Sequence, residues 1–288
     1  MKLISIGCSF SNKGERMKIV TSGCSFSGHT THPLIEEESW SYQLSKRLNL
    51  SVQDTYHLGL GGCSLDYIYR GILHAVIDNL GQDLLVVVGW TSVQRWEHFA
   101  NKSGNCQAIT SNPSFPNFGK VADRYHYSAQ AFWKSTLDQD KSYKQHMMNH
   151  TLFQDHMRKL NMIIGLAGFL DSHNIKYIFF NAFDPLDGWK KGTGYYGKSE
   201  TGPDCPVLNK LTDYVRENVN FLEQTQIEIG AKEGYEEKIR NGDYDGDETT
   251  NPYTKKEYFS HDGWHPSVVG HTEWAKILHR ELNKRWEL

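Results

Sequence analysis

Apolar and polar positions follow two patterns along this chain: short apolar runs typical of strands, and apolar residues three or four positions apart, typical of helices. The predicted strands lie at residues 19–21, 52–58, 84–88 and 175–181. The helical spacing lies at residues 39–48, 65–80, 143–173, 207–221 and 267–286. Strands that alternate with helices predict a doubly wound parallel sheet. The run at 84–88 is apolar throughout, as expected for a central strand whose two faces are both buried.

Three of the helices carry more detailed signals. Ser39 precedes the first helix and is a plausible N-cap. The helix at 65–80 is expected to face the core with Leu65, Ile68, Ile72, Leu73, Val76 and Ile77. The last helix is expected to face the core with Val269, Trp274, Ile277, Leu278 and Leu282.

Two stretches interrupt the alternation, at about residues 96–142 and 185–260. The first is rich in Asn, Ser, Gly, Pro and aromatic residues, and the second holds clusters of Gly, Asp, Asn and Tyr. We interpret both as long insertions. The expected architecture is one α/β domain over residues 17–288, a three-layer α/β/α flavodoxin-like parallel sheet with these two insertions.

The N-terminus contains a short repeat. Residues 1–11 read MKLISIGCSFS and residues 17–27 read MKIVTSGCSFS. One sheet has room for only one such first strand, so we interpret residues 1–16 as a duplicated leader. This interpretation leaves two origins open, a duplication or a start codon upstream of Met17.

Composition excludes several classes of protein. The net charge of −3 lacks the basic balance of a chain that grips nucleic acid through phosphates. The five cysteines form no CxxC pair, which predicts a reducing, cytoplasmic location without a disulfide framework. The N-terminus shows no secretory signal, and the apolar runs are too short to span a membrane.

Chemistry-bearing segments follow the predicted strands. These are Ser22–Ser27, His57–Gly62, Gly89–Ser92 and, before the last helix, Asp262–Pro266. In parallel sheets, ligands bind beyond the carboxyl ends of the strands, so we expect these segments to meet there. A small-residue turn can present a serine hydroxyl, and a histidine held by an acid can accept its proton. Glycines allow a backbone N–H to approach a substrate oxygen.

These segments resemble the motif blocks of the SGNH/GDSL hydrolase family. The Gly-Asp-Ser-Leu block matches Gly23–Phe26, and the block-two glycine matches Gly62. The Gly-x-Asn-Asp block matches Gly89–Ser92, and the Asp-x-x-His-Pro block matches Asp262–Pro266. The GCSFS, GWTS and DGWHP variants are similar to those of bacteriophage members of the family.

The resemblance implies the SGNH hydrolase fold and a serine hydrolase without cofactor, an esterase or O-deacetylase acting on a small-molecule or glycan ester. Ser25 would be the nucleophile, His265 its base and Asp262 the residue that orients the histidine. The backbone N–H groups of Ser25 and Gly62 and the side chain of Thr91 would bind the oxyanion.

This chain departs from the family pattern at two positions. Cys24 replaces a mainly structural aspartate, and Thr91 replaces the asparagine that donates to the oxyanion. Arg95 either supplies a compensating charge or forms a structural ion pair. Trp90, Arg95 and Trp264 are the candidates for substrate binding.

Other assignments remain open at this stage. Ser9 in the first repeat copy is a rival nucleophile, although only Ser25 is spaced from Gly62 for one helix and one strand. His29 and His32 lack a completing set of ligands, and residues 241–247 resemble a calcium loop that has Pro252 at its last ligand position. We therefore expect no metal.

The sequence leaves one competing function open and disfavours another. Thr91 and the long insertions are compatible with an inactive SGNH-like binding or structural protein, a virion component or a homo-oligomer. A nucleotide-binding flavodoxin-like domain is disfavoured, because no glycine-rich dinucleotide or Walker motif opens a helix.

Overall fold

The computed structural model describes the following residues: 16–24, 27, 36–60, 63–93, 96–102, 105–111, 120–122, 128–131, 152–182, 185–187, 193–194, 197–198, 205–230, 258 and 266–288. Most of the N-terminal repeat copy, residues 1–15, lies outside this part of the chain.

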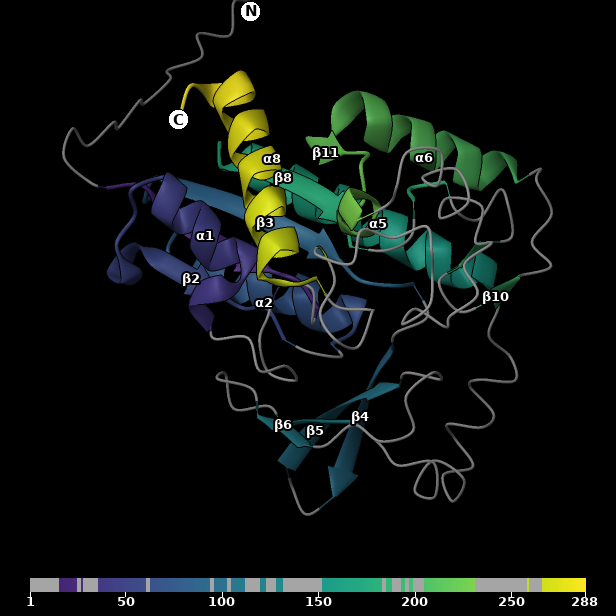
Figure 1. Ribbon diagram of the computed structural model, residues 1–288. Coiled ribbons are helices and arrows are strands. Elements are labelled where there is room, and N and C mark those ends of the chain that lie inside the picture. Colours follow the sequence, from purple (N-terminus) through teal and green to yellow (C-terminus); the bar gives the residue numbers. More distant parts are fainter. Residues whose placement is uncertain are drawn as a thin grey trace, which may run out of the picture.

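A five-stranded parallel sheet forms the centre of the fold (Figure 1). Its strands in spatial order are β11 (Phe221–Leu222), β8 (Lys176–Asn181), β3 (Leu84–Trp90), β1 (Lys18–Ser22) and β2 (Thr55–His57). From the opposite edge the strands follow the order β2, β1, β3, β8 and β11, which is the flavodoxin-like strand order. All four strand contacts are parallel. The predicted fold class is therefore confirmed.

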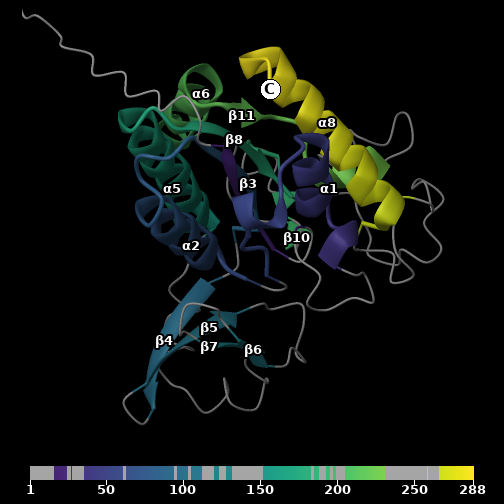
Figure 2. The ribbon, with the colours of Figure 1, turned by 90° about the vertical axis from the view of Figure 1, so that its left-hand side faces the viewer.

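Helices cover both faces of the sheet (Figure 2). One face packs against α2 (Leu65–Ile77), α5 (Leu152–Ser172) and α6 (Pro206–Asn218). The other packs against α1 (Trp40–Arg47) and α8 (Val268–Trp286). Three short 3-10 turns complete the described helical segments: η1 (Glu36–Glu38), η2 (Val52–Asp54) and η4 (Gln226–Gly230).

Local sequence explains where the main elements lie. Every residue of β3 is buried, as its wholly apolar sequence predicts for a central strand. Ser39, Ser64 and Ser267 cap α1, α2 and α8, each accepting a hydrogen bond from a backbone N–H of the first turn. The predicted cap at Ser39 is thus confirmed.

The structure corrects the expected apolar faces of two helices. Ile77 is 54% exposed and Val269 is 45% exposed. At roughly 100° per residue, Ile77 projects well away from the stripe formed by Ile68, Ile72 and Val76, and Val269 projects opposite Trp274. Residues 52–54 also differ from the expected strand, because they form η2 and leave only Thr55–His57 as β2.

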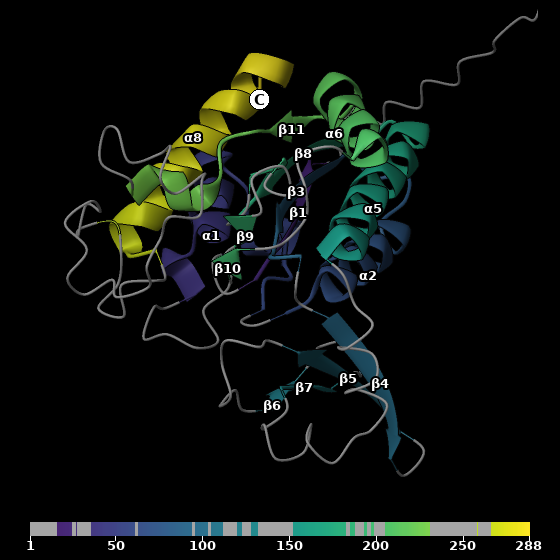
Figure 3. The ribbon, with the colours of Figure 1, turned by 90° about the vertical axis from the view of Figure 1, so that its right-hand side faces the viewer.

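The expected insertions contain regular structure. The first holds a second, four-stranded sheet in the order β4 (Trp96–Lys102), β5 (Asn105–Ser111), β7 (Ser128–Ala131) and β6 (Lys120–Ala122) (Figure 3). Its sequence lacks the alternation that would have predicted these strands. In the second insertion, residues 206–222 supply α6 and β11 and so belong to the central fold. A short hairpin, β9 (Thr193–Gly194) and β10 (Gly197–Lys198), precedes them.

Candidate active site

The order of the strands reverses between β1 and β3. From β1 the chain passes to β2 on one side, and it returns to β3 on the other. Ser22 at the end of β1 pairs with Val88 near the end of β3. Ligands bind at such a switch point, beyond the carboxyl ends of the strands. The segments after β1, β2 and β3, all predicted to carry chemistry, therefore begin at this edge.

The structure describes two of the predicted site residues, Trp90 and Thr91. The others lie outside the described residues: Ser25, Gly62, Arg95, Asp262, Trp264 and His265. The described residues also exclude Ser9, His29, His32 and residues 241–247. The geometry of the site is therefore built from the residues that flank these positions.

Cys24 and Ser27, which flank Ser25 and Phe26 in the sequence, are both buried. The backbone N–H of Ser27 donates to the carbonyl of Cys24 over 2.7 Å. The Ser27 hydroxyl accepts a hydrogen bond from the indole Nε1 of Trp40 at 3.0 Å. Helix α1 therefore holds the segment that follows β1 from one side.

Glycine is required at position 23 by close packing. A Cβ placed on Gly23 would lie 2.1 Å from Ser27 Oγ and 3.0 Å from the carbonyl oxygen of Gly89. A Cβ on Gly89 would lie 2.8 Å from the ring of Phe180. The small residues of the first and third motifs thus allow the ends of β1 and β3 to meet around Ser27.

The loop after β2 is joined to the end of β1. The N–H of Leu58 donates to the carbonyl of Thr21 at 2.8 Å, and that of Leu60 donates to the carbonyl of Gly23 at 3.0 Å. The buried thiol of Cys63 also donates to the Gly23 carbonyl, at 3.3 Å. Leu60 and Cys63 lie on either side of residues 61–62, so both ends of the segment that carries Gly62 are bound to β1.

The residues after β3 are buried and polar. Thr91 is completely buried, and its hydroxyl has no hydrogen-bond partner among the described residues. A buried polar group without a partner costs about 1–3 kcal/mol. Such a group is suited to binding a ligand, which would supply the missing partner.

Trp90 is also completely buried, and its ring packs edge-on against Phe179 with the centroids 5.8 Å apart. The substrate-binding role of Trp90 stays a prediction. Beside this tryptophan lies Asn181, the last residue of β8, which is paired with Trp90 in the sheet. Neither amide atom of Asn181 has a partner among the described residues. The sequence reading missed Asn181, although a polar residue that ends an apolar strand of a parallel sheet is a usable signal.

A polar group on α5 was also not predicted. Asp155, His156 and Lys159 are all at most 5% exposed. Burial, together with the positive charge of Lys159, lowers the pKa of His156 to about 3. His156 is therefore neutral at physiological pH in the folded protein. The sequence reading treated this segment only as a helix, because its apolar positions dominate the pattern.

Arg158 on the same helix forms hydrogen bonds to α2 and to the segment after β3. Its Nη1 donates to the carboxylate of Asp66 in α2, and its Nη2 donates to the carbonyl of Val93, both over 3.2 Å. Burial lowers the pKa of Arg158, an effect that the Asp66 and Asp155 carboxylates oppose.

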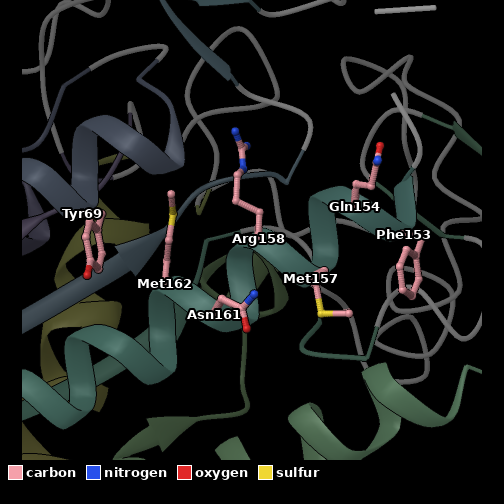
Figure 4. Close-up of a pocket in the computed structure, with 7 residues that line it drawn as sticks. All are labelled: Tyr69, Phe153, Gln154, Met157, Arg158, Asn161 and Met162. Carbon is pink, nitrogen blue, oxygen red and sulfur yellow. The ribbon is translucent and has the colours of Figure 1, made fainter. Parts of the chain in front are cut away.

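Arg158 also lines an open pocket of about 520 Å³ along α2 and α5 (Figure 4). The other lining residues are Tyr69, Phe153, Gln154, Met157, Asn161 and Met162. In Figure 4, Arg158 and Gln154 leave α5 on the same side of the helix.

The start of α8, just after the predicted histidine, is held in place by α1. The N–H of Trp40 donates to Nδ1 of His271 over 3.2 Å. Ser267 N–H donates to the carbonyl of Tyr258 at 2.8 Å, and a Cβ on Gly270 would lie 2.4 Å from that same oxygen. The segment that follows His265 is therefore packed against the helix that also holds Ser27.

Within the part of the chain that the structure describes, no three His, Cys, Asp or Glu side chains gather as a metal site would require. Among those same residues, no helix is both long and apolar enough to cross a membrane.

Comparison with protein-family models found no match, and comparison with curated proteins found none either. Several solved structures are similar. A GDSL-like lipase from Bacteroides thetaiotaomicron is 11% identical with a TM-score of 0.43, covering 93% of this chain and 88% of its own. An acetylxylan esterase from Geobacillus stearothermophilus is 11% identical with a TM-score of 0.43, covering 93% and 94%.

An α/β hydrolase from the metagenome of Lake Arreo is also 11% identical, with a TM-score of 0.42 and coverage of 93% and 94%.

Proposed function

We propose that this chain is a serine hydrolase of the SGNH/GDSL type that cleaves an acyl ester, as an esterase or O-deacetylase. The observation that carries the proposal is the joining of the motif-bearing loops at the switch point. Gly23 after β1 accepts hydrogen bonds from Leu60 and Cys63 of the next loop. On the other side, Trp40 connects Ser27 to His271 at the start of α8.

In the proposed reaction, the Ser25 hydroxyl attacks the ester carbonyl and His265 accepts its proton. The tetrahedral intermediate expels the alcohol, which takes that proton, and leaves an acyl group on Ser25. Water then attacks the acyl-enzyme and gives a proton to His265. The Ser25 oxygen leaves and takes that proton, and the carboxylic acid is released. Asp262 holds the imidazole in the required tautomer.

The proposed oxyanion donors are the N–H groups of Ser25 and Gly62 and the hydroxyl of Thr91. The complete burial of Thr91 and its hydroxyl without a partner among the described residues support this role, since a donor kept for the transition state has no other acceptor. Trp90, Arg95 and Trp264 remain proposed substrate contacts.

A fluorophosphonate probe tests the proposal, because it reacts with an activated serine. We expect the wild-type protein to be labelled and the label to map to Ser25 by peptide mass spectrometry. Ser25→Ala should abolish labelling, and His265→Ala should slow it. Ser9→Ala is the matched control from the repeat copy and should label normally. Labelling that survives in Ser25→Ala would contradict the assignment of the nucleophile.

The alternative is an inactive SGNH-like binding or structural protein, such as a virion component. The observation that favours it is the hydroxyl of Thr91 in place of a longer side-chain amide. A folded protein that reacts with no probe, hydrolyses no short-chain ester or acetylated sugar and forms a stable assembly would support this alternative.

A further inference from the structure

Arg158 bridges the start of α2, which follows β2, and the segment that follows β3. Its guanidinium bonds Asp66 and the Val93 carbonyl, each over 3.2 Å. Asp66 lies in the first turn of α2, four residues after Gly62, and Val93 lies two residues after Thr91. The bridge therefore joins the first turn of α2 to the segment after β3, and each of these lies within four residues of a proposed oxyanion donor.

The arginine is suited to this task by its chemistry and its surroundings. A guanidinium is planar, presents its donors in a rigid fork and remains charged, so it fixes two acceptors relative to each other. The Arg158 side chain is 14% exposed and that of Asp66 is 30% exposed, so the ion pair is partly shielded from water. It projects from α5, a helix whose buried residues pack against the sheet.

We propose that Arg158 is a positioning residue for the proposed oxyanion hole, holding the start of α2 and the segment that follows Thr91 in a fixed relative position. The inference rests on the proposed hydrolase function. Arg158 does not itself contact the reacting atoms in this assignment, and it acts through Asp66 and Val93.

Kinetics of Arg158→Gln and Asp66→Asn with a short-chain nitrophenyl ester test the inference. Loss of the bridge should lower kcat roughly tenfold to a hundredfold, because small displacements of catalytic donors have effects of that size. KM should change by less than about threefold, since ground-state binding does not need the oxyanion donors. The double variant should be no slower than the slower single variant, because both changes remove the same bridge.

Arg216→Gln is the matched control. Arg216 also forms ion pairs, with Asp187, Asp213 and Glu223, but all of these partners lie outside the loops after β1, β2 and β3. It should lower the unfolding temperature without changing kcat. Arg158→Lys keeps the charge but not the planar fork, so it should recover only part of the lost kcat.

The outcomes separate the inference from the function on which it rests. Active wild-type protein with unchanged kcat in folded Asp66→Asn and Arg158→Gln overturns the inference alone. A rise in KM with unchanged kcat also overturns it, and assigns Arg158 to substrate binding at the pocket of Figure 4. Wild-type protein that neither turns over esters nor accepts the probe overturns both. If Arg158→Gln does not fold, Asp66→Asn decides the question.

Discussion

The indole Nε1 of Trp40 donates a hydrogen bond of 3.0 Å to the hydroxyl of Ser27, and both side chains are buried. The backbone N–H of the same tryptophan donates to His271 in α8. One residue at the start of α1 thus holds the segment after β1 and the beginning of the last helix.

Trp40→Phe should be destabilising because it leaves the buried Ser27 hydroxyl without its donor. The matched control is Trp274→Phe: Trp274 also packs on Phe180, but its Nε1 has no partner among the described residues. We expect Trp40→Phe to lower the free energy of unfolding in urea by about 1–2 kcal/mol more than Trp274→Phe does. Equal losses would show that the Trp40–Ser27 bond contributes nothing.

Gly23→Ala should destabilise the protein severely, because its Cβ would lie 2.1 Å from Ser27 Oγ. We expect a cost of about 2 kcal/mol or more, measured by urea unfolding. Adding Ser27→Gly should recover part of this loss. Gly168→Ala on α5 has no atom within 4 Å of the new Cβ and should instead stabilise by about 0.5–1 kcal/mol. A well-tolerated Gly23→Ala would contradict the packing described around Ser27.

Thr91→Val should lower the activity without lowering the stability of the protein. Removing a buried hydroxyl without a partner should leave the free energy of unfolding unchanged or raise it by up to about 1 kcal/mol. Removing an oxyanion donor should lower kcat by about a hundredfold. Thr91→Ser keeps the hydroxyl and should retain most of the activity. Loss of stability in Thr91→Val with unchanged kcat would instead assign the hydroxyl to an internal bond.

His156 should make the protein less stable in acid. Burial lowers its pKa to about 3 in the folded state, whereas the unfolded chain binds the proton near the ordinary value of 6.5. Between these values the unfolded state binds more protons, so stability falls as the pH drops below 6.5, by at most about 1.4 kcal/mol per pH unit. Urea unfolding at several pH values should show a weaker dependence in His156→Leu over that range. An unchanged dependence would exclude this source.

Local sequence was sufficient for much of the central fold. The apolar run 84–88 and the helical spacing at 39–48 and 65–80 predicted β3, α1 and α2, because burial on both faces gives an unbroken apolar run and burial of one stripe gives a helical period. It was not sufficient for β11, which lies in a stretch expected to be an insertion. The second sheet, β4 to β7, was missed because its residues show no such period.

The sequence by itself determined that the motif-bearing segments follow strands of a parallel sheet, and the sheet places the ends of those strands at one edge. Tertiary structure alone decided what joins those segments: Trp40 to Ser27 and His271, Cys63 to Gly23, and Arg158 to Asp66 and Val93. These partners lie far apart along the chain, and no periodic pattern encodes a pairing between them. The same holds for the burial of His156 and Asn181, since burial of a polar side chain depends on which elements pack around it.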